Sequence, residues 1–248
     1  MTIFNAKKNI FGGCVVEPRD LPADPEEFSA RLEYSLGIWK DEGIKVVWLE
    51  VSRDKAQLIP LCTAAGFIFH HASEELLEMT LALIPGSTIP PYATHYIGAG
   101  GVVLDNDKRL LVVSERYKQA PGRRLKLPGG ALKEGEHIAA AVVREVKEET
   151  GIDARFEYVA CFRHWHNYRY GKSDIYFVCR LSPLSTEIHM DPGELVECLW
   201  LPLDEYLADP DVHNFNKHVV RAATSGNKGL VENSIPEYAS ETYELMAL

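Results

Sequence analysis

The spacing of hydrophobic residues in the first part of the chain switches between helical and strand periods. Apolar side chains recur at helical spacing from Pro25 to Lys40, which predicts an amphipathic helix. The run from Lys45 to Ser52 is almost continuously apolar and rich in β-branched residues, as expected of a buried strand. A second helix is predicted over residues 55–65, and the segments FIFHHA and LLEMTLAL then predict a hairpin. This alternation predicts a small N-terminal α/β domain over residues 1–92.

The segment IPGSTIPPYATH is rich in proline, which predicts a linker and a second domain over residues 93–248. Strands are predicted in YIGAGGVVL, RLLVVSE, RFEYVACFRHW, DIYFVCRL and ELVECLWLP, with the turn DNDK joining the first two. Helices are predicted over residues 136–149, 204–207 and 216–223. In the first of these helices, Ile138, Val142 and Val146 form an apolar stripe that faces the core, and Gly151 ends the helix. The second domain is therefore also α/β.

The charge of the chain narrows the choice of partners. Its formal net charge is −10, which argues against a nucleic acid or an anionic membrane as a partner. A phosphate-containing substrate would be repelled unless metal ions reversed the local charge. The five cysteines are scattered and form no CxxC pair, so we expect reduced thiols in a cytoplasmic protein. The sequence shows neither a signal-peptide pattern nor an apolar run long enough to span a membrane.

Four glutamates crowd together in the segment GGALKEGEHIAAAVVREVKEETGI. Glu145, Glu148 and Glu149 share one side of the predicted helix, with Arg144 among them and Glu136 shortly before. Carboxylates this close repel by about 1 kcal/mol per pair in water. A solvated acidic helix face would explain the charges, but hard cations such as Mg²⁺ favour such oxygens. The Gly-Gly turn before the helix also directs backbone N–H groups outward, which suits an anion.

The same segment resembles the Nudix box, GX5EX7REUXEEXGU, in which U is a bulky aliphatic residue. All nine specified positions match: Gly130, Glu136, Arg144, Glu145, Val146, Glu148, Glu149, Gly151 and Ile152. The segments LKLPGG, GKSDIYFVCRLSPLS and GFIFHHA are similar to a Nudix subgroup with an N-terminal extension. That subgroup includes the animal Nudix motif 6 proteins and plant ADP-ribose/NADH pyrophosphatases.

This resemblance implies an α/β/α sandwich with a mixed sheet and hydrolysis of a nucleoside diphosphate linked to a moiety X. Mg²⁺ or Mn²⁺ is the implied cofactor. The implied metal-site residues are Glu145, Glu148, Glu149 and Gly130, with Gly130 shaping the loop. The candidate catalytic residues are Glu148, Arg144, which would orient a glutamate, and Glu194, which would be a general base outside the box. Glu197 is the rival base, and either glutamate can equally be an ordinary surface residue.

ADP-ribose and NADH are the favoured substrates. A nucleoside triphosphate, a diadenosine polyphosphate, CoA or an RNA cap remain alternatives, as does a nucleotide sensor without activity. The candidate substrate-binding residues are Arg116, Lys126, Arg163 and Trp165, and Arg123, Arg124 and Lys172 are further cations near the expected site. Trp165 is placed to stack on a base. The flanking His164 and His166 make only a weak metal pattern, since no further ligand is evident.

The N-terminal unit has an order of elements similar to half of an acetyltransferase fold. It has no Gly-rich turn before a helix that would hold the pyrophosphate of CoA. We therefore expect a structural role and a homodimer contact. The pair His70 and His71 is expected to pack at a strand end and not to form a site.

Overall fold

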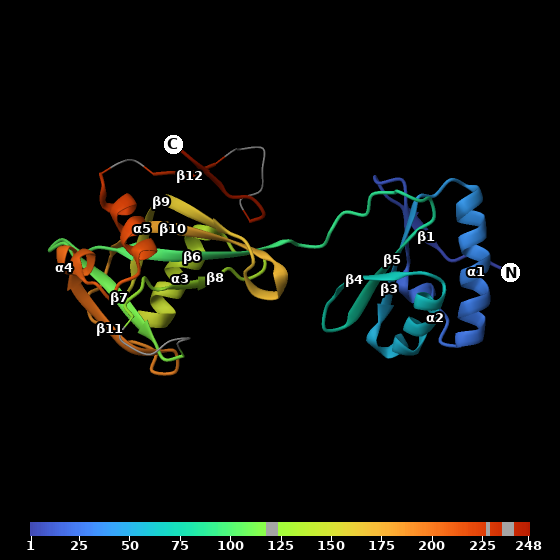
Figure 1. The fold of residues 1–248 in the computed structure, drawn as a ribbon, viewed down its shortest axis with the longest axis horizontal. Coiled ribbons are helices and arrows are strands. Elements are labelled where there is room, and N and C mark those ends of the chain that lie inside the picture. The colour runs from blue at the N-terminus through green and yellow to red at the C-terminus, as the bar shows by residue number, and fades with distance from the viewer. Residues whose placement is uncertain (118–123, 227–228, 235–240) are drawn as a thin grey trace. The chain divides into compact units, whose positions relative to one another are not determined.

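The computed structural model describes residues 1–117, 124–226, 229–234 and 241–248. The chain divides into two compact units, Met1–Ala93 and Thr94–Leu248 (Figure 1). The proline-rich segment crosses the point of division, as its composition suggests. In the part of the chain that is described, no helix is long and apolar enough to cross a membrane.

The N-terminal unit is a five-stranded sheet in the order β1-β2-β3-β5-β4. The strands are β1 (Ala6–Lys8), β2 (Cys14–Val16), β3 (Val46–Ser52), β4 (Ile68–Ala72) and β5 (Leu76–Ala82), and a 3₁₀ turn, η1, covers Pro18–Asp20. β2 and β3 are parallel and are joined through helix α1 (Pro25–Asp41), while the other pairs are antiparallel. Helix α1 begins at Asp24, whose side chain accepts from the Glu26 N–H, and it buries Phe28, Leu32 and Trp39.

The second predicted helix is wrong in its extent. A 3₁₀ segment, η2 (Arg53–Leu58), comes first, and the α-helix, α2, covers only Ile59–Ala64. The reason is Pro60, which lies in the first turn of α2 and has no N–H to donate to a carbonyl of the preceding turn. The end of the helix is as predicted, since Gly66 follows it with φ +95°.

The second unit contains the strands β6 (His95–Val103), β7 (Arg109–Glu115), β8 (Gly129–Ala131), β9 (Ala154–Trp165), β10 (Ser173–Pro183), β11 (Leu195–Pro202), β12 (Val231–Asn233) and β13 (Leu245–Ala247). Its helices are α3 (Ile138–Thr150), α4 (Leu203–Ala208) and α5 (Asn214–Thr224), with a 3₁₀ turn, η3, at Arg169–Gly171. One mixed sheet has the order β8-β6-β10-β9, in which β6 and β10 are parallel. β7 pairs with β11 in a separate sheet, although the predicted turn joins β7 directly to β6.

Side chains on these strands alternate between two hydrophobic cores. Val102 and Val178 lie in a core with residues of α4 and α5, whereas their neighbours Val103 and Cys179 lie in a core with α3. Because alternate residues of a strand point to opposite faces, helices cover both sides of the strands. The α/β/α sandwich with a mixed sheet is confirmed, and α3 is one of its outer layers.

Candidate active site

Helix α3 presents carboxylates both at the surface and towards the interior. Val142 and Val146 are fully buried on the inner face of the helix. Gly151 ends the helix in the left-handed conformation, with φ +76°. These contacts fix the rotation of the helix. Glu149 is therefore turned inward and is only 5% exposed, while the side chain of Glu148 is 55% exposed.

Arg144 joins three of the glutamates. Its Nε and Nη2 donate to the two carboxylate oxygens of Glu136 at 2.6 and 2.8 Å. Its Nη1 donates to Glu145 Oε1 and to Glu148 Oε2, each at 2.8 Å. A planar guanidinium can make such paired contacts, which a lysine cannot. One half-buried cation thus holds the carboxylates in place against their mutual repulsion.

Two glycines of β8 bring the backbone against the same carboxylates. The Gly129 N–H donates to Glu149 Oε2 at 2.9 Å. A Cβ on Gly130 would lie 2.7 Å from the carboxyl carbon of Glu145, which is closer than real Cβ contacts allow. Gly130 therefore leaves room for the Glu145 carboxylate.

The pKa values of two of these glutamates move in opposite directions. The hydrogen bonds from Arg144 lower the pKa of Glu136 to about 2. Burial raises the pKa of Glu149 to about 7, although Lys126 and the Gly129 N–H act in the other direction. Glu145 and Glu194 add to the rise through their negative charges. Glu149 is thus a carboxylate whose ionised form needs further positive charge, which a divalent cation would provide.

The donor set fits a hard divalent cation. Glu145, Glu148 and Glu149 offer only carboxylate oxygens, the ligands that Mg²⁺ and Mn²⁺ prefer. The room beside Gly130 that a methyl group would fill is occupied by the Glu145 carboxylate. These residues would hold the ion, with Arg144 and Gly129 as the outer contacts that orient them.

A cleft of about 380 Å³ begins beside this cluster. Gly129 and Gly130 form part of its wall, so the cleft borders the predicted metal site. The rest of the wall combines aromatic and cationic residues with two acidic ones: Tyr96, Tyr168, Tyr176, Phe215, Lys126, Arg163, Arg169, Glu115 and Asp174. The volume lies within the range of about 300–1,000 Å³ that is typical of small-molecule sites.

Two of the predicted substrate-binding residues lie in this cleft. Lys126 forms an ion pair with Glu115 at 2.5 Å, and Arg163 forms one with the buried Asp174 at 2.5 Å. The guanidinium of Arg163 lies over the ring of Trp165, 5.0 Å from its centroid. Trp165 is half exposed and is not part of the cleft wall, but it contacts two residues of that wall, this arginine and Tyr168.

The structure places Arg116 in a different position. Its Nε donates to the Pro192 carbonyl at 2.8 Å, and its backbone N–H donates to the Glu194 carbonyl at 2.7 Å. Arg116 thus holds the loop that carries Glu194. Glu194 is exposed but near enough to influence the pKa of Glu149, while Glu197 is half-buried on β11. Arg123 lies outside the described residues.

An anionic side chain of the protein itself lies at the start of the helix. The N–H groups of Ile138 and Ala139 donate to the carboxylate of Glu244, at 2.9 and 3.1 Å. The Glu244 carboxylate therefore satisfies two of the free donors at the start of the helix, which suit an anion. The helix also begins two residues later than predicted, at Ile138.

Sequence inspection missed most of the cleft wall. Tyr96, the adjacent pair Tyr168 and Arg169, and Phe215 come from three separate segments, which no local spacing connects. The glycines of β6 could have indicated that a large side chain, which is Tyr176, packs against this strand. A Cβ on Gly100 would lie 2.1 Å from the Tyr176 hydroxyl, so this strand is glycine-rich where the tyrosine packs on it.

Comparison with known proteins agrees with the geometry. Residues 94–223 match the family model described as the NUDIX domain, and residues 4–83 match a second model described as a Nudix hydrolase domain. Nudix hydrolase 8 of Arabidopsis thaliana is 39% identical over 84% of this chain, and the match spans 58% of that protein. Nudix hydrolase 2 of the same plant is 38% identical over 86% of this chain and 77% of its own length.

An animal protein is similar as well. The nucleoside diphosphate-linked moiety X motif 6 protein of Xenopus laevis is 43% identical over 61% of this chain and 70% of its own length. The two family models together account for both units of the structure. The chain belongs to the Nudix hydrolase family.

Proposed function

We propose that the protein hydrolyses the pyrophosphate of a nucleoside diphosphate linked to X, with ADP-ribose and NADH as favoured substrates and Mg²⁺ or Mn²⁺ as cofactor. The observation that carries the proposal is the complete set of carboxylates that Arg144 and the two glycines hold beside the cleft. Nudix hydrolases generally use divalent cations. The ion would stabilise the negative charge that develops on the phosphates.

The side chains of the site have separate roles in the proposed reaction. Glu145, Glu148 and Glu149 bind the cation, and Arg144 keeps Glu145 and Glu148 aligned. Lys126 and Arg163 line the cleft and offer positive charge to the phosphates. Glu194 accepts a proton from the water that attacks phosphorus, while the bond to the bridging oxygen breaks. The products are AMP and ribose 5-phosphate from ADP-ribose, or AMP and reduced nicotinamide mononucleotide from NADH.

The aromatic wall of the cleft supports a substrate with planar groups. Tyr96 and Tyr168 contact each other edge to face, with ring centroids 6.0 Å apart. Both line the cleft, together with Phe215. Rings of this kind stack on nucleobases and add roughly 1–3 kcal/mol per base. A dinucleotide such as NADH, or an adenosine diphosphate linked to a sugar, would use these rings better than a compact triphosphate.

A substrate panel with Mg²⁺, read by chromatography of the products, tests the proposal. ADP-ribose, NADH, a nucleoside triphosphate, a diadenosine polyphosphate, CoA and capped RNA are compared at equal concentration. We expect ADP-ribose and NADH to be cleaved fastest. Cleavage of triphosphates alone would overturn the choice of X, and binding of nucleotides without turnover would indicate a sensor.

The N-terminal unit would form a homodimer contact. Strand β4 is at the edge of its sheet, where Ile68 and Phe69 are 62% and 63% exposed. An apolar edge strand pairs readily with a second copy of itself. Phe69→Asp should lower the mass measured by light scattering of the full chain. A monomeric wild-type protein would contradict this contact.

A further inference from the structure

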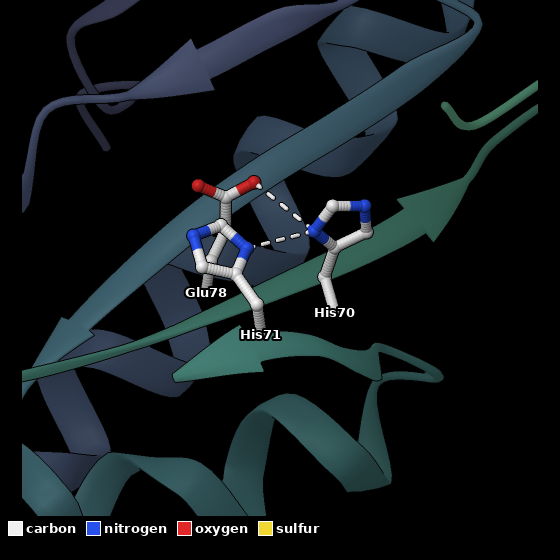
Figure 2. Close-up of side chains that lie close together, drawn as sticks. All are labelled: His70, His71 and Glu78. Atoms are coloured by element: carbon white, nitrogen blue, oxygen red, sulfur yellow. Dashed lines mark hydrogen bonds and ion pairs between the residues drawn. The ribbon is translucent and has the colours of Figure 1, made fainter. Parts of the chain in front are cut away.

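Three side chains with metal-binding atoms converge in the N-terminal unit, away from the Nudix box in the sequence. Figure 2 shows His70 and His71 of β4 together with Glu78 of β5. The Nδ1 atoms of the two histidines are 2.8 Å apart, and His70 Nδ1 is 3.8 Å from Glu78 Oε1. One ligand atom from each of the three residues lies within 4.8 Å of the others. This spacing brings all three within reach of one ion.

A β-bulge explains how two consecutive residues reach the same place. In the ladder between β4 and β5, Phe69 is opposite Met79 and His71 is opposite Glu78, so His70 is an extra residue. Neighbouring side chains of a regular strand point to opposite faces, but a bulge redirects one of them. Bulges often lie beside functional sites for this reason. The irregularity makes one cluster of side chains that a regular hairpin would separate.

The ring of His70 is oriented in the way that metal ligands are. Its Nε2 lies 2.8 Å from the carbonyl oxygen of Pro90. A carbonyl only accepts hydrogen bonds, so Nε2 carries the hydrogen and the neutral ring has its lone pair on Nδ1. Histidine ligands typically donate their other N–H to a carbonyl or carboxylate in this manner. His70 Nδ1 is therefore prepared to bind a cation between itself, His71 and Glu78.

His71 is fixed by a different contact. Its ring is stacked on Tyr92, with centroids 4.2 Å apart and an interplanar angle of 2°. The side chains of His70 and Glu78 are each only 14% exposed. Two facing nitrogens at 2.8 Å repel unless a proton or a metal ion lies with them. The half-buried position favours a cation that Glu78 also contacts, because the carboxylate would neutralise part of its charge.

We propose that His70, His71 and Glu78 bind a Zn²⁺ ion, with water in the fourth position. Two imidazoles and one carboxylate are a typical zinc ligand set, whereas Mg²⁺ and Mn²⁺ favour the all-carboxylate set of the Nudix box. The ion would fix the β-bulge to the segment that follows β5, since Pro90 contacts one ligand and Tyr92 the other. From the sequence alone, this histidine pair was expected to pack at a strand end. The third ligand could not be seen there, because Glu78 becomes a neighbour of the histidines only when β4 pairs with β5.

Cobalt spectroscopy of the full-length protein tests the site separately from the Nudix box. Tetrahedral Co²⁺ absorbs visible light much more strongly than octahedral Co²⁺ in a carboxylate and water site. We expect one equivalent of Co²⁺ to give the strong bands, and one equivalent of Zn²⁺ to remove them. His71→Phe keeps a ring that can stack on Tyr92 but removes the ligand, and Glu78→Gln keeps the shape of the carboxylate.

Each of these two variants should lose the strong bands. Each should also bind Zn²⁺ more weakly by more than the roughly 10- to 100-fold that loss of an outer-shell contact costs. His164→Phe is the matched control, because His164 lies 2.9 Å from His95 in the other unit and forms a separate histidine contact. Strong bands that persist in His71→Phe and Glu78→Gln would overturn the proposal, and so would bands that disappear only in His164→Phe. Glu78→Gln decides the result if His71→Phe does not fold.

Discussion

The Nudix box and the His70–Glu78 cluster gather ionisable side chains in two different ways. The glutamates of the box lie on α3 or just before it, and Arg144 forms ion pairs with three of them. On β4 and β5 a bulge brings two histidines together, and their nitrogens face each other across 2.8 Å. The first cluster is organised by the chain itself. The second has ligand atoms in place, and its two facing nitrogens can share either a proton or a metal ion, so the two sites should respond differently to loss of a ligand and to added metal.

The largest effect should separate the two clusters directly. Glu149→Gln keeps the shape of the side chain but removes a charge that a divalent ion requires, so turnover should fall by roughly 10³-fold or more. Mn²⁺ affinity should fall with it, measured by calorimetry, while the Co²⁺ bands of the histidine site stay unchanged. Glu134→Gln, an exposed change just before the helix, is the control. Wild-type activity in Glu149→Gln would remove the proposed metal site.

The next effect separates binding of the ion from proton transfer within the active site. If Glu194 accepts the proton from water, Glu194→Gln should reduce kcat by roughly 10²- to 10⁴-fold with Mn²⁺ affinity nearly unchanged. The matched variant is Glu197→Gln, since Glu197 was the rival base and lies on β11, directly after the loop that carries Glu194. A larger loss in Glu197→Gln than in Glu194→Gln would exchange their roles.

These contrasts also show why sequence predicted one cluster and not the other. The carboxylates of α3 follow from helical periodicity, since Val142 and Val146 fix the buried face and the intervening positions follow. The histidine cluster depends on a register shift between Phe69 and His71, which no propensity encodes. The cleft wall was hidden for the same reason, because Tyr96 and Phe215 line one cleft only after the chain has folded. The spacing of residues along the sequence therefore predicted the carboxylates that lie on one helix, but not the sites that several elements form together.

A third prediction concerns how Arg144 organises the box without metal. Because the pKa of Glu136 is lowered to about 2 in the folded protein, its pairing stabilises the fold above the unfolded value near 4.5. That stability is lost as the pH falls from about 4.5 to 2. Glu136→Gln should therefore cost roughly 1.5–3 kcal/mol at pH 7 and much less near pH 2. Urea unfolding at both pH values measures it, and an equal cost at each pH would contradict the ion-pair explanation.

The smallest effect tests the carboxylate that binds the N–H groups at the start of α3. Glu244 accepts from the N–H groups of Ile138 and Ala139, so it acts as a cap for α3 from a distant part of the chain. Glu244→Ala should cost about 1 kcal/mol, as the loss of a helix N-cap does, and Glu244→Gln should cost less because one oxygen acceptor remains. For a unit of this size we expect the thermal midpoint to fall by about 2–4 °C.

Glu232→Ala on the adjacent β12 is the control, since Glu232 is exposed. Mg²⁺ affinity should stay unchanged in all three variants, because Arg144 in the middle of α3 and Gly129 on β8 hold the ligands. If Glu244→Ala weakened metal binding as strongly as Glu149→Gln does, the metal site of the Nudix box would depend on the cap of its helix. The contacts of Arg144 and Gly129 would then not be enough to organise the box, and its difference from the histidine cluster would be lost.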